Sequence, residues 1–370
     1  MDQLTLTSYL KLLACDGVGV LSARKLLDLS KNVNGLFDPS NKQFFADFNI
    51  PKSIQNALLQ FDKNDVIQEE LKFIEKNHIN CVGILDDAYP KLLKECADAP
   101  ILLFYKGDLS LLNNNCLAIV GTRKISAYGK EVTAKLMEHL QSYKPTIVSG
   151  MAYGVDIAAY HEARKVNLPT VGIMGTSFKK LYPAMHKNFY NDLFNNGLII
   201  TEYAGFNALV PELFTRRNRI IAGLCTATVV IESAETGGSL STAYFANDYA
   251  REVYAVPGKI NDEFSKGCLR LIHENRAQLL YNFDHLIADL NWNTTDDPKK
   301  QAEVKKQINL NDFTELQQTI LKTLQNEPLH IDELALQTQL SMSVLNSELM
   351  MLELNGIVVG LPGKMFKVKD

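Results

Sequence analysis

Short apolar runs alternate with longer helical patterns through the middle of the chain, and this alternation constrains the fold most. Between about residues 81 and 290, runs rich in β-branched residues predict strands at 117–120, 146–149, 170–174, 198–203, 227–231 and 253–256. The segments between them, such as 127–143 and 188–196, are polar on one face and long enough for crossover helices. Strands that alternate with helices in this way predict an α/β fold with a parallel, doubly wound sheet.

The regions on either side of the sheet have different patterns. A chain of 370 residues exceeds one ordinary core, so we expect two or three domains. Residues 1–78 are helical in pattern, rich in Leu and without predicted strands. Residues 79–290 carry the sheet, residues 291–310 read as a polar linker, and residues 311–370 read as a compact module.

A glycine turn in the first region has two interpretations. Residues 16–27 read Asp-Gly-Val-Gly-Val-Leu-Ser-Ala-Arg-Lys-Leu-Leu, which looks like a helix-hairpin-helix motif. The turn of such a motif presents backbone amides to a DNA phosphate. A plain turn between packed helices fits the same residues, so the sequence leaves both interpretations open.

The last region predicts a winged helix. Helical patterns cover 313–324, 331–340 and 343–355, and 357–359 with 366–368 predict a β-wing around Pro362 and Gly363. The third helix has no Lys or Arg, and from residue 311 onward eight acidic residues stand against four lysines. Because a reader of the DNA groove needs basic residues on that helix, we expect the module to contact proteins rather than DNA.

Composition narrows the class of protein. A content of 46% hydrophobic and 22% charged residues is typical of soluble globular proteins, and no run of ~18 apolar residues is present to span a membrane. The first residues lack the pattern of a secretion signal, so we expect a cytoplasmic protein. Six scattered cysteines without a Cys-x-x-Cys pair predict buried thiols, neither a disulfide framework nor a zinc site; they are Cys15, Cys81, Cys96, Cys116, Cys225 and Cys268.

Charge is uneven along the chain. The net charge is −4, yet residues 117–281 hold eighteen Lys and Arg against fourteen Asp and Glu, which leaves +4 there and −8 in the remainder. Such asymmetry predicts one basic face for an anionic polymer.

Three segments of the middle region place small residues, hydroxyls and arginines where strands meet helix starts: 117–123, 216–223 and 235–242. A helix start exposes unpaired N–H groups and the positive end of the helix dipole, and glycine lets an anion approach the backbone. Ligands of a doubly wound sheet bind at the carboxyl ends of its strands. Together the segments predict a site for a polyanion.

The first segment ends in Gly121, Thr122 and Arg123, ahead of a helix that Ser126 is suited to cap. It lacks the three-glycine spacing of a dinucleotide site, and the strand after it ends in Ser149-Gly150 rather than in an acidic residue.

The turn that Ser149 and Gly150 begin reaches the same edge of the predicted sheet. Asp156 and His161 follow it and suit an acid and base pair. We favour the interpretation that Asp156 stabilises the helix start and that His161 packs or forms a hydrogen bond within the helix.

The second segment is the most unusual run and comprises Arg216, Arg217, Asn218 and Arg219. Its guanidinium groups suit bidentate contacts with phosphate, and the alternative is that some of them pair with Glu202 or Glu232. Phe214 fits stacking on a base, worth roughly 1–3 kcal/mol, and fits a place in the core equally well.

The third segment contains Gly237, Gly238 and Ser239 at a predicted helix start. Glycine flexibility and nearby hydroxyls indicate an anion nest, without the lysine of a Walker loop.

Taken in order, these motifs resemble the DprA family, also called Smf, the DNA-processing proteins of bacterial natural transformation. Agreement is dense from about residue 86 to residue 280 and looser on either side. The residues that carry the resemblance are Ile-Val-Gly-Thr-Arg at 119–123, Ser-Gly-Met-Ala-Tyr-Gly-Val-Asp at 149–156, Tyr182-Pro183, Arg-Asn-Arg-Ile-Ile-Ala-Gly-Leu at 217–224, Gly-Gly-Ser-Leu-Ser-Thr-Ala at 237–243 and Val-Pro-Gly at 256–258.

The resemblance implies an extended Rossmann-like domain that binds single-stranded DNA without a cofactor, preceded by a helical domain of the SAM or helix-hairpin-helix type. It implies a homodimer formed near residues 267–280, and a role in protecting incoming DNA and loading the recombinase RecA. Arg123 then contacts a phosphate and Phe214 lies against a base. The predicted DNA-binding set is Gly121, Thr122, Arg123, Ser149, Gly150, Lys187, Phe214, Arg216, Arg217, Asn218, Arg219, Gly237, Gly238 and Ser239.

Two positions depart from the family pattern. Ala184 stands where a lysine usually follows the Tyr-Pro pair, and Pro211 stands where a basic residue often precedes the aromatic. Lys187 and Arg216 are the candidates to compensate for them.

The rival class is enzymatic. Nucleotide phosphoribohydrolases of the lysine-decarboxylase-like fold share a doubly wound sheet and a Gly-Gly-x-Gly-Thr-x-x-Glu loop, but here Leu240 takes the place of the later glycine and Tyr244 that of the acid. Without that carboxylate the hydrolysis has no evident general acid or base.

A purely structural adaptor is disfavoured by the clustered arginines. We therefore predict a cytoplasmic, dimeric, non-enzymatic binder of single-stranded DNA, with no metal and no membrane partner.

Overall fold

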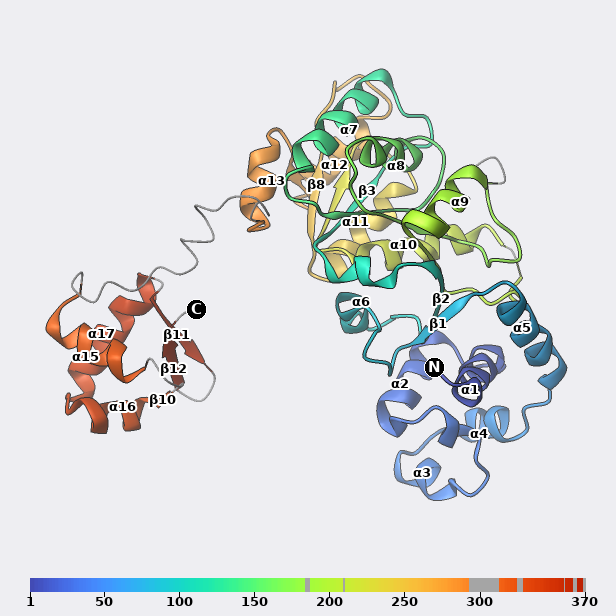
Figure 1. The fold of residues 1–370 in the computed structure, drawn as a ribbon, viewed down its shortest axis with the longest axis horizontal. Coiled ribbons are helices and arrows are strands. Elements are labelled where there is room, and N and C mark those ends of the chain that lie inside the picture. Colours follow the sequence, from blue (N-terminus) through green and yellow to red (C-terminus); the bar gives the residue numbers. More distant parts are fainter. Residues whose placement is uncertain are drawn as a thin grey trace. The chain divides into compact units, whose positions relative to one another are not determined.

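The computed structural model describes residues 1–183, 187–208, 210–292, 313–324, 329–355, 357–361 and 365–368. Its contacts divide the chain into two compact units, Met1–Thr295 and Asp296–Asp370 (Figure 1). The predicted linker at 291–310 lies almost wholly outside the described residues. The finer boundaries near residues 78 and 290 stay predictions.

A nine-stranded sheet organises the described part of the first unit. Its order is β1-β2-β6-β5-β4-β3-β7-β8-β9. The strands are β1 (Asn80–Gly83), β2 (Leu102–Gly107), β3 (Cys116–Val120), β4 (Thr146–Ser149), β5 (Thr170–Ile173), β6 (Leu198–Thr201), β7 (Ala227–Val230), β8 (Glu252–Ala255) and β9 (Gln278–Leu279). All pairs from β6 to β9 are parallel, which confirms the doubly wound sheet, whereas β2 pairs antiparallel with both β1 and β6.

The strand order creates a switch point between β3 and β7. From β3 the chain adds β4, β5 and β6 on one side, and it then returns to add β7, β8 and β9 on the other. Because the connections after β3 and β7 leave in opposite directions, a crevice forms at the carboxyl ends of these two strands.

The two faces of the sheet belong to two hydrophobic clusters. Alternate residues of β3 divide between them: Leu117 and Ile119 join one cluster and Ala118 joins the other, as the two-residue period of a strand requires. The first cluster packs under α7 (Ala127–Leu140), α8 (Val155–Lys165) and α13 (Phe283–Asp289). The second packs under α10 (Glu212–Leu224), α11 (Ser239–Asp248) and α12 (Lys266–His273), while α9 (Lys187–Asn196) lies over a smaller cluster of its own.

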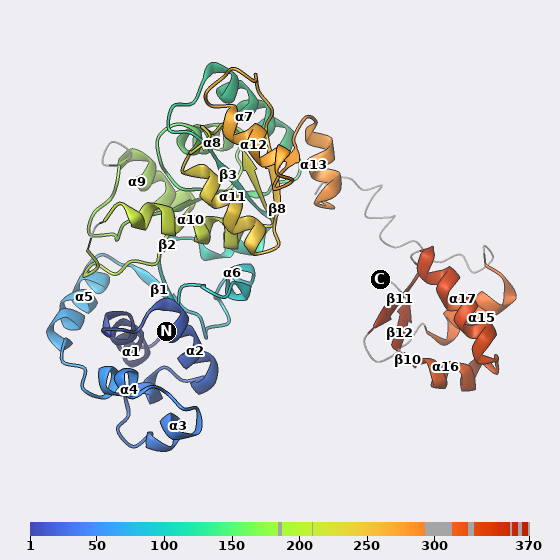
Figure 2. The same cartoon turned by 180° about the vertical axis from the view of Figure 1, so that it is seen from behind.

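Residues 1–78, all of which are described, contain helices and no strand, as predicted. The α-helices are α1 (Gln3–Ala14), α2 (Val20–Ser30), α3 (Lys42–Asp47), α4 (Lys52–Leu59) and α5 (Asn64–Lys76). They lie together beside β1 in both views (Figures 1 and 2). Tyr9, Leu27 and Leu58 belong to the same cluster as one face of the sheet. The helical region is therefore packed into the first unit, together with the short α6 (Lys91–Glu95).

The second unit is a winged helix with a small core of its own. It contains α15 (Glu315–Thr323), α16 (Ile331–Thr338), α17 (Met342–Leu354) and a sheet of β10 (Leu329–His330), β12 (Met365–Val368) and β11 (Val358–Leu361) in that order. Pro362 and Gly363 of the predicted wing turn lie outside the described residues. In α15 Leu316 is 40% exposed, whereas Ile320 and Leu321 are buried.

The cysteines are free, as predicted: five are buried and Cys81 is half-buried. Within the described ranges, every helix is too short or too polar to cross a membrane.

Candidate nucleic-acid interface

A cleft of about 300 Å³ opens at the switch point of the sheet. Loops that follow β3, β4 and β7 line it together with one side of α10 and the starts of α8 and α11. The lining residues are Val120, Gly121, Thr122, Arg123, Ala152, Asp156, Phe214, Thr215, Arg217, Asn218, Ile221, Ala234, Gly237, Gly238, Ser239 and Thr242. The three segments singled out in the sequence therefore meet around one cleft.

The loop after β3 is fixed by its neighbours on both sides. The Thr122 amide donates to the Glu232 carbonyl over 2.7 Å, and the Thr122 carbonyl accepts from the Val155 amide over 3.1 Å. A Cβ at Gly121 would lie 2.5 Å from a Val155 methyl carbon, so only glycine fits there. Arg123 is exposed at the rim of the cleft. Among the side chains that the structure describes, no acidic group forms an ion pair with Arg123.

A buried carboxylate holds the start of α7 beside this loop. Ser126 caps the helix, as predicted, by accepting from the Gly129 amide over 3.0 Å. Glu232 in turn accepts from the Ser126 amide over 2.9 Å and from the Ser126 hydroxyl over 2.5 Å. The Glu232 carboxylate thus accepts hydrogen bonds from the start of α7 and, among the described residues, does not pair with an arginine of the basic run.

The basic run of α10 does not form one patch. A helix turns about 100° per residue, so four successive side chains point in different directions. Arg216 is exposed and lines a separate cleft, whereas Arg217 and Arg219 are 5% and 3% exposed.

Arg217 lies in the floor of the cleft and joins it to the sheet. Its Nη1 donates to the Gly150 carbonyl over 2.6 Å and to the Ile173 carbonyl. A Cβ at Gly150 would lie 2.5 Å from Arg217 Nη2, so glycine is needed for this approach. Burial raises the pKa of the neighbouring Asp156 carboxyl, and the charge of Arg217 opposes that rise.

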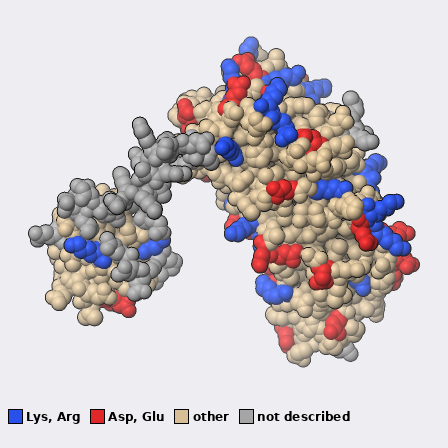
Figure 3. Space-filling model, in the orientation of Figure 1, with Lys and Arg blue, Asp and Glu red and all other residues tan. Residues whose placement is uncertain are grey.

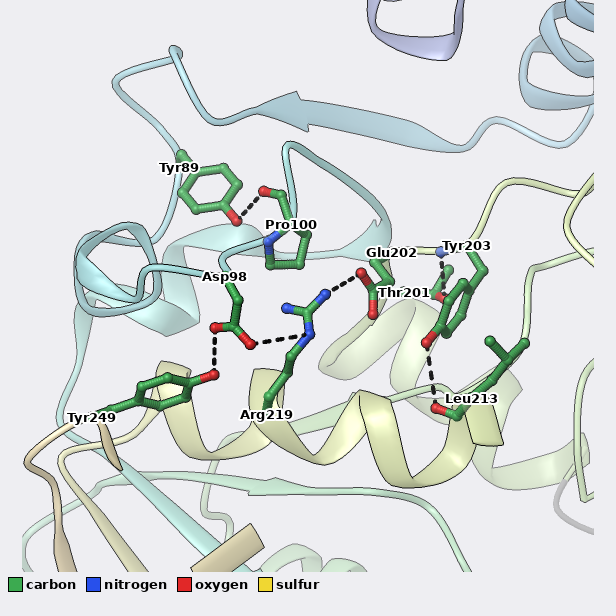
Figure 4. A network of polar contacts seen from close by, with 9 residues as sticks. All are labelled: Tyr89, Asp98, Pro100, Thr201, Glu202, Tyr203, Leu213, Arg219 and Tyr249. Carbon is green, nitrogen blue, oxygen red and sulfur yellow. Dashed lines mark hydrogen bonds and ion pairs between the residues drawn. The ribbon is translucent and has the colours of Figure 1, made fainter. Parts of the chain in front are cut away.

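Arg219 takes part in a buried ion-pair network (Figure 4). It reaches from α10 to Glu202, with which it forms an ion pair, and its Nε lies 3.7 Å from an Asp98 oxygen. Tyr249 donates a 2.5 Å hydrogen bond to the same Asp98. Pairing with Glu202, the alternative left open by the sequence, therefore occurs at Arg219.

Asn218 connects α10 to the glycine loop. Its Nδ2 donates to the Gly238 carbonyl over 3.2 Å and to the Ser241 hydroxyl over 2.9 Å. Apart from the adjacent backbone, no described atom lies within 4 Å of the place that a Gly238 Cβ would occupy, so an approaching group can reach the backbone there. The Ser239 hydroxyl instead donates to Ser233 over 2.9 Å.

An aromatic pair lies at one side of the cleft: Phe214 lines the cleft, and Tyr182 lines a small adjoining cavity. Phe214 is half-buried, and its ring lies 5.2 Å from that of Tyr182 with a 59° tilt. Tyr182 is 44% exposed, and Phe214 also packs on Gly175. The sequence analysis gave Tyr182 as part of the Tyr182-Pro183 motif but did not include it in the predicted site. That motif was the one feature of the sequence that could have indicated a role for Tyr182.

The remaining predicted residues have other positions. The Ser149 hydroxyl is buried and donates to the Ile119 carbonyl over 2.9 Å. Lys187 begins α9, and Ala184 lies outside the described residues.

Asp156 and His161 line different cavities. Asp156 accepts from the Ala152 amide over 3.2 Å. His161 packs edge-on against Phe189 with ring centroids 4.6 Å apart. Both residues fit the interpretation favoured above: Asp156 lies in the first turn of α8, where an acid stabilises the helix start, although the N-cap itself is Gly154, and His161 packs against an aromatic ring.

Acidic side chains interrupt the basic ones on the face drawn in Figure 3, where red and blue are interspersed over the first unit. Several cations are paired, including Arg164 with Asp192, Arg251 with Glu95 and Arg270 with Glu274. The surplus of +4 is therefore not displayed there as the single basic face that the sequence predicted.

Comparison with known proteins assigns the part of the chain that forms this cleft to a family. The model for DNA recombination-mediator protein A matches residues 80–291, which include every residue that lines the cleft, and the model for the DprA winged helix domain matches residues 303–364. The chain belongs to the family of DNA recombination-mediator protein A.

Relatives in this family match more than half of the chain. DNA processing protein DprA of Streptococcus pneumoniae is 39% identical over 210 residues, which cover 57% of this chain and 74% of that protein. Its X-ray structure gives a TM-score of 0.66 at 33% identity and covers 76% of this chain and 97% of that one. A structure of DNA processing protein A from Helicobacter pylori, which describes that protein's single-stranded DNA binding mode, gives a TM-score of 0.53 at 28% identity and covers 58% and 97% of the two chains.

Proposed function

We propose that the chain binds single-stranded DNA in the cleft at the switch point and acts as a recombination mediator. The observation that carries the proposal is the composition of the cleft. Exposed Arg123, the open backbone at Gly238 and the half-buried Phe214 stand around one opening. A guanidinium and exposed amides suit phosphates, and aromatic rings suit unstacked bases. The H. pylori relative, described by its single-stranded DNA binding mode, supports the same ligand.

We propose separate roles for most of the predicted DNA-binding residues, on the basis of their contacts. In this proposal Arg123, Gly238 and Phe214 touch the strand, and Tyr182 joins them as a second ring. Arg217, Asn218, Gly150 and Ser149 position these groups, because their polar atoms are bonded to neighbouring elements. Gly121, Thr122, Gly237 and Ser239 set the shape of the two loops.

Fluorescence anisotropy of a labelled oligo-dT tests the proposal, with a duplex of equal length as the comparison. The wild type should bind the single strand more tightly. Arg123→Ala should bind more weakly and flatten the log–log dependence on salt by about 0.7, the value for one lost phosphate contact on a single strand. Lys135→Ala is the matched control, because Lys135 is exposed, pairs with Glu131 and does not line the cleft. Equal binding of strand and duplex would overturn the proposal.

The family of DNA recombination-mediator protein A supports a proposal for the wider role. We propose that the protein protects incoming single strands in the cytoplasm during natural transformation and loads RecA onto them without catalysing a reaction itself. RecA ATPase activity on strands coated with single-strand-binding protein should then rise when this protein is added. Arg123→Ala should remove the stimulation.

A nucleoside-monophosphate hydrolysis assay tests the phosphoribohydrolase alternative, and we expect no turnover.

The homodimer is likewise a proposal. The edge strand β9 carries Leu279, 45% exposed, and Tyr281 beside it is 66% exposed. An open edge with apolar side chains suits pairing with a second copy. Sedimentation of the wild type and of Leu279→Asp tests this, with a dimer expected only for the wild type.

A further inference from the structure

A second cleft, of about 500 Å³, lies between the helical region and α10. It is lined by Gly19, Val20, Leu21, Ser22, Asp98, Arg216, Arg219 and Phe245. All of these residues belong to the first unit. The cleft therefore faces the glycine turn that the sequence left with two interpretations.

The first turn of α2 forms one wall of this cleft. Gly19 is the N-cap and provides no side chain to accept from the amides of the following residues. The early amides of a helix have no acceptor within the helix and stand at the positive end of its dipole. Gly17, with φ of 74°, makes the sharp turn from α1 that places this helix start.

Two arginines of α10 form the opposite wall. Arg216 is exposed. Arg219 is 3% exposed, and its Nη1 has no hydrogen-bond partner among the described residues, although its other nitrogens face Glu202 and Asp98. A buried guanidinium N–H without an acceptor is costly unless a ligand supplies one. The Asp98 carboxylate also lines the cleft, but it faces Tyr249 and Arg219.

The N-terminal part of α10 connects the two clefts. Thr215 lines the first cleft and Arg216 lines the second, and both residues are exposed. A strand that leaves the first cleft can therefore cross α10 at this point without meeting buried groups.

We propose that the second cleft binds a backbone phosphate of the same single strand, between the first turn of α2 and Arg216 with Arg219. The inference rests on the proposed function and extends the DNA path from the sheet to the helical region. It assigns the glycine turn to phosphate binding instead of simple packing.

Gly19→Asp tests the proposal without disturbing the fold. A Cβ at Gly19 meets nothing within 4 Å, and its φ of −78° is ordinary for any residue. Aspartate is a favoured N-cap, so the variant should fold at least as well as the wild type. Its carboxylate would occupy the α2 amides and repel a phosphate.

Binding is measured with a length series of oligo-dT. Short strands that fill only the first cleft should bind Gly19→Asp and wild type equally. Above a threshold length the variant should bind about tenfold more weakly, as expected for losing a favourable contact at a helix start. Arg216→Gln should show the same length dependence, and the double variant should lose no more than either single one, because both act on one phosphate.

Ser53→Asp is the matched control. Ser53 is exposed in the first turn of α4, so it adds the same charge at another helix start of the same region, outside the cleft. It should leave the whole series unchanged.

Unchanged affinity of Gly19→Asp for every length would overturn this inference alone. The same result is expected if the second cleft binds free phosphate instead of a phosphate of the strand. Failure of the wild type to bind any length would overturn the proposed function and the inference together.

Discussion

At the residue scale, exposure separates arginines that look alike in the sequence. Arg123 is exposed at a cleft, whereas Arg219 is buried against Glu202. The sequence placed Arg216, Arg217 and Arg219 in one basic run, and it could not show which of them is used inside the protein. The rotation of α10 decides this, together with acids that are distant in sequence, such as Glu202.

Arg219→Leu should lower the free energy of unfolding by about 3–5 kcal/mol, because it leaves a buried carboxylate without its partner. Chemical denaturation of the full chain measures this. Adding Glu202→Leu should recover most of the loss, since both charges are then absent.

Arg164→Leu is the control for that experiment. Arg164 pairs with Asp192 over 3.0 Å, but both side chains are about one-third exposed, so the cost should be at most ~1 kcal/mol. Equal costs for the two arginines would contradict the assignment of Arg219 to a buried pair.

At the element scale, the site depends on how helix starts are held against the sheet. The sequence predicted six of the strands because each is a β-branched run ahead of a helical pattern. It did not predict β1, β2 and β9, since the first two pair antiparallel at one edge and β9 has two residues. The capping of α7 by Ser126 was predicted from local pattern, but its bond to Glu232, 106 residues away, was not.

Ser126→Ala should cost roughly 2 kcal/mol of unfolding free energy, through loss of the α7 cap and of one donor to buried Glu232. It should also weaken binding of oligo-dT, because the loop that carries Arg123 loses its support.

Ser341→Ala removes a helix cap from the second unit and serves as the control. It should destabilise that unit by about 0.5–1 kcal/mol and leave DNA binding unchanged. A loss of DNA binding in both variants would contradict the role given to the α7 start.

At the scale of the whole molecule, each unit has its own core, and the cleft lies entirely in the first. The division into a sheet-bearing unit and a winged helix was predictable, because the two patterns differ and a polar segment separates them. The packing of residues 1–78 into the first unit was not, because only the structure shows that Tyr9 and Leu27 join the core of the sheet.

A chain that ends at residue 295 should bind oligo-dT as tightly as the full chain, with the same dependence on salt. The acidic balance of the winged helix gives it no phosphate contacts to lose. Anisotropy on the two chains side by side makes the measurement, and a drop of more than about tenfold in affinity would move part of the DNA site into the second unit.

Photo-crosslinking tests the central claim most directly, namely that the strand lies in the cleft at the switch point. An oligo-dT that carries a 5-iodouracil base is irradiated with the full-length protein, and mass spectrometry locates the attached residue. We predict attachment at Phe214, whose ring lines the cleft, or at Tyr182, whose ring packs against Phe214, and its loss in Arg123→Ala. Attachment confined to the winged helix, with none at the aromatic pair, would contradict the account.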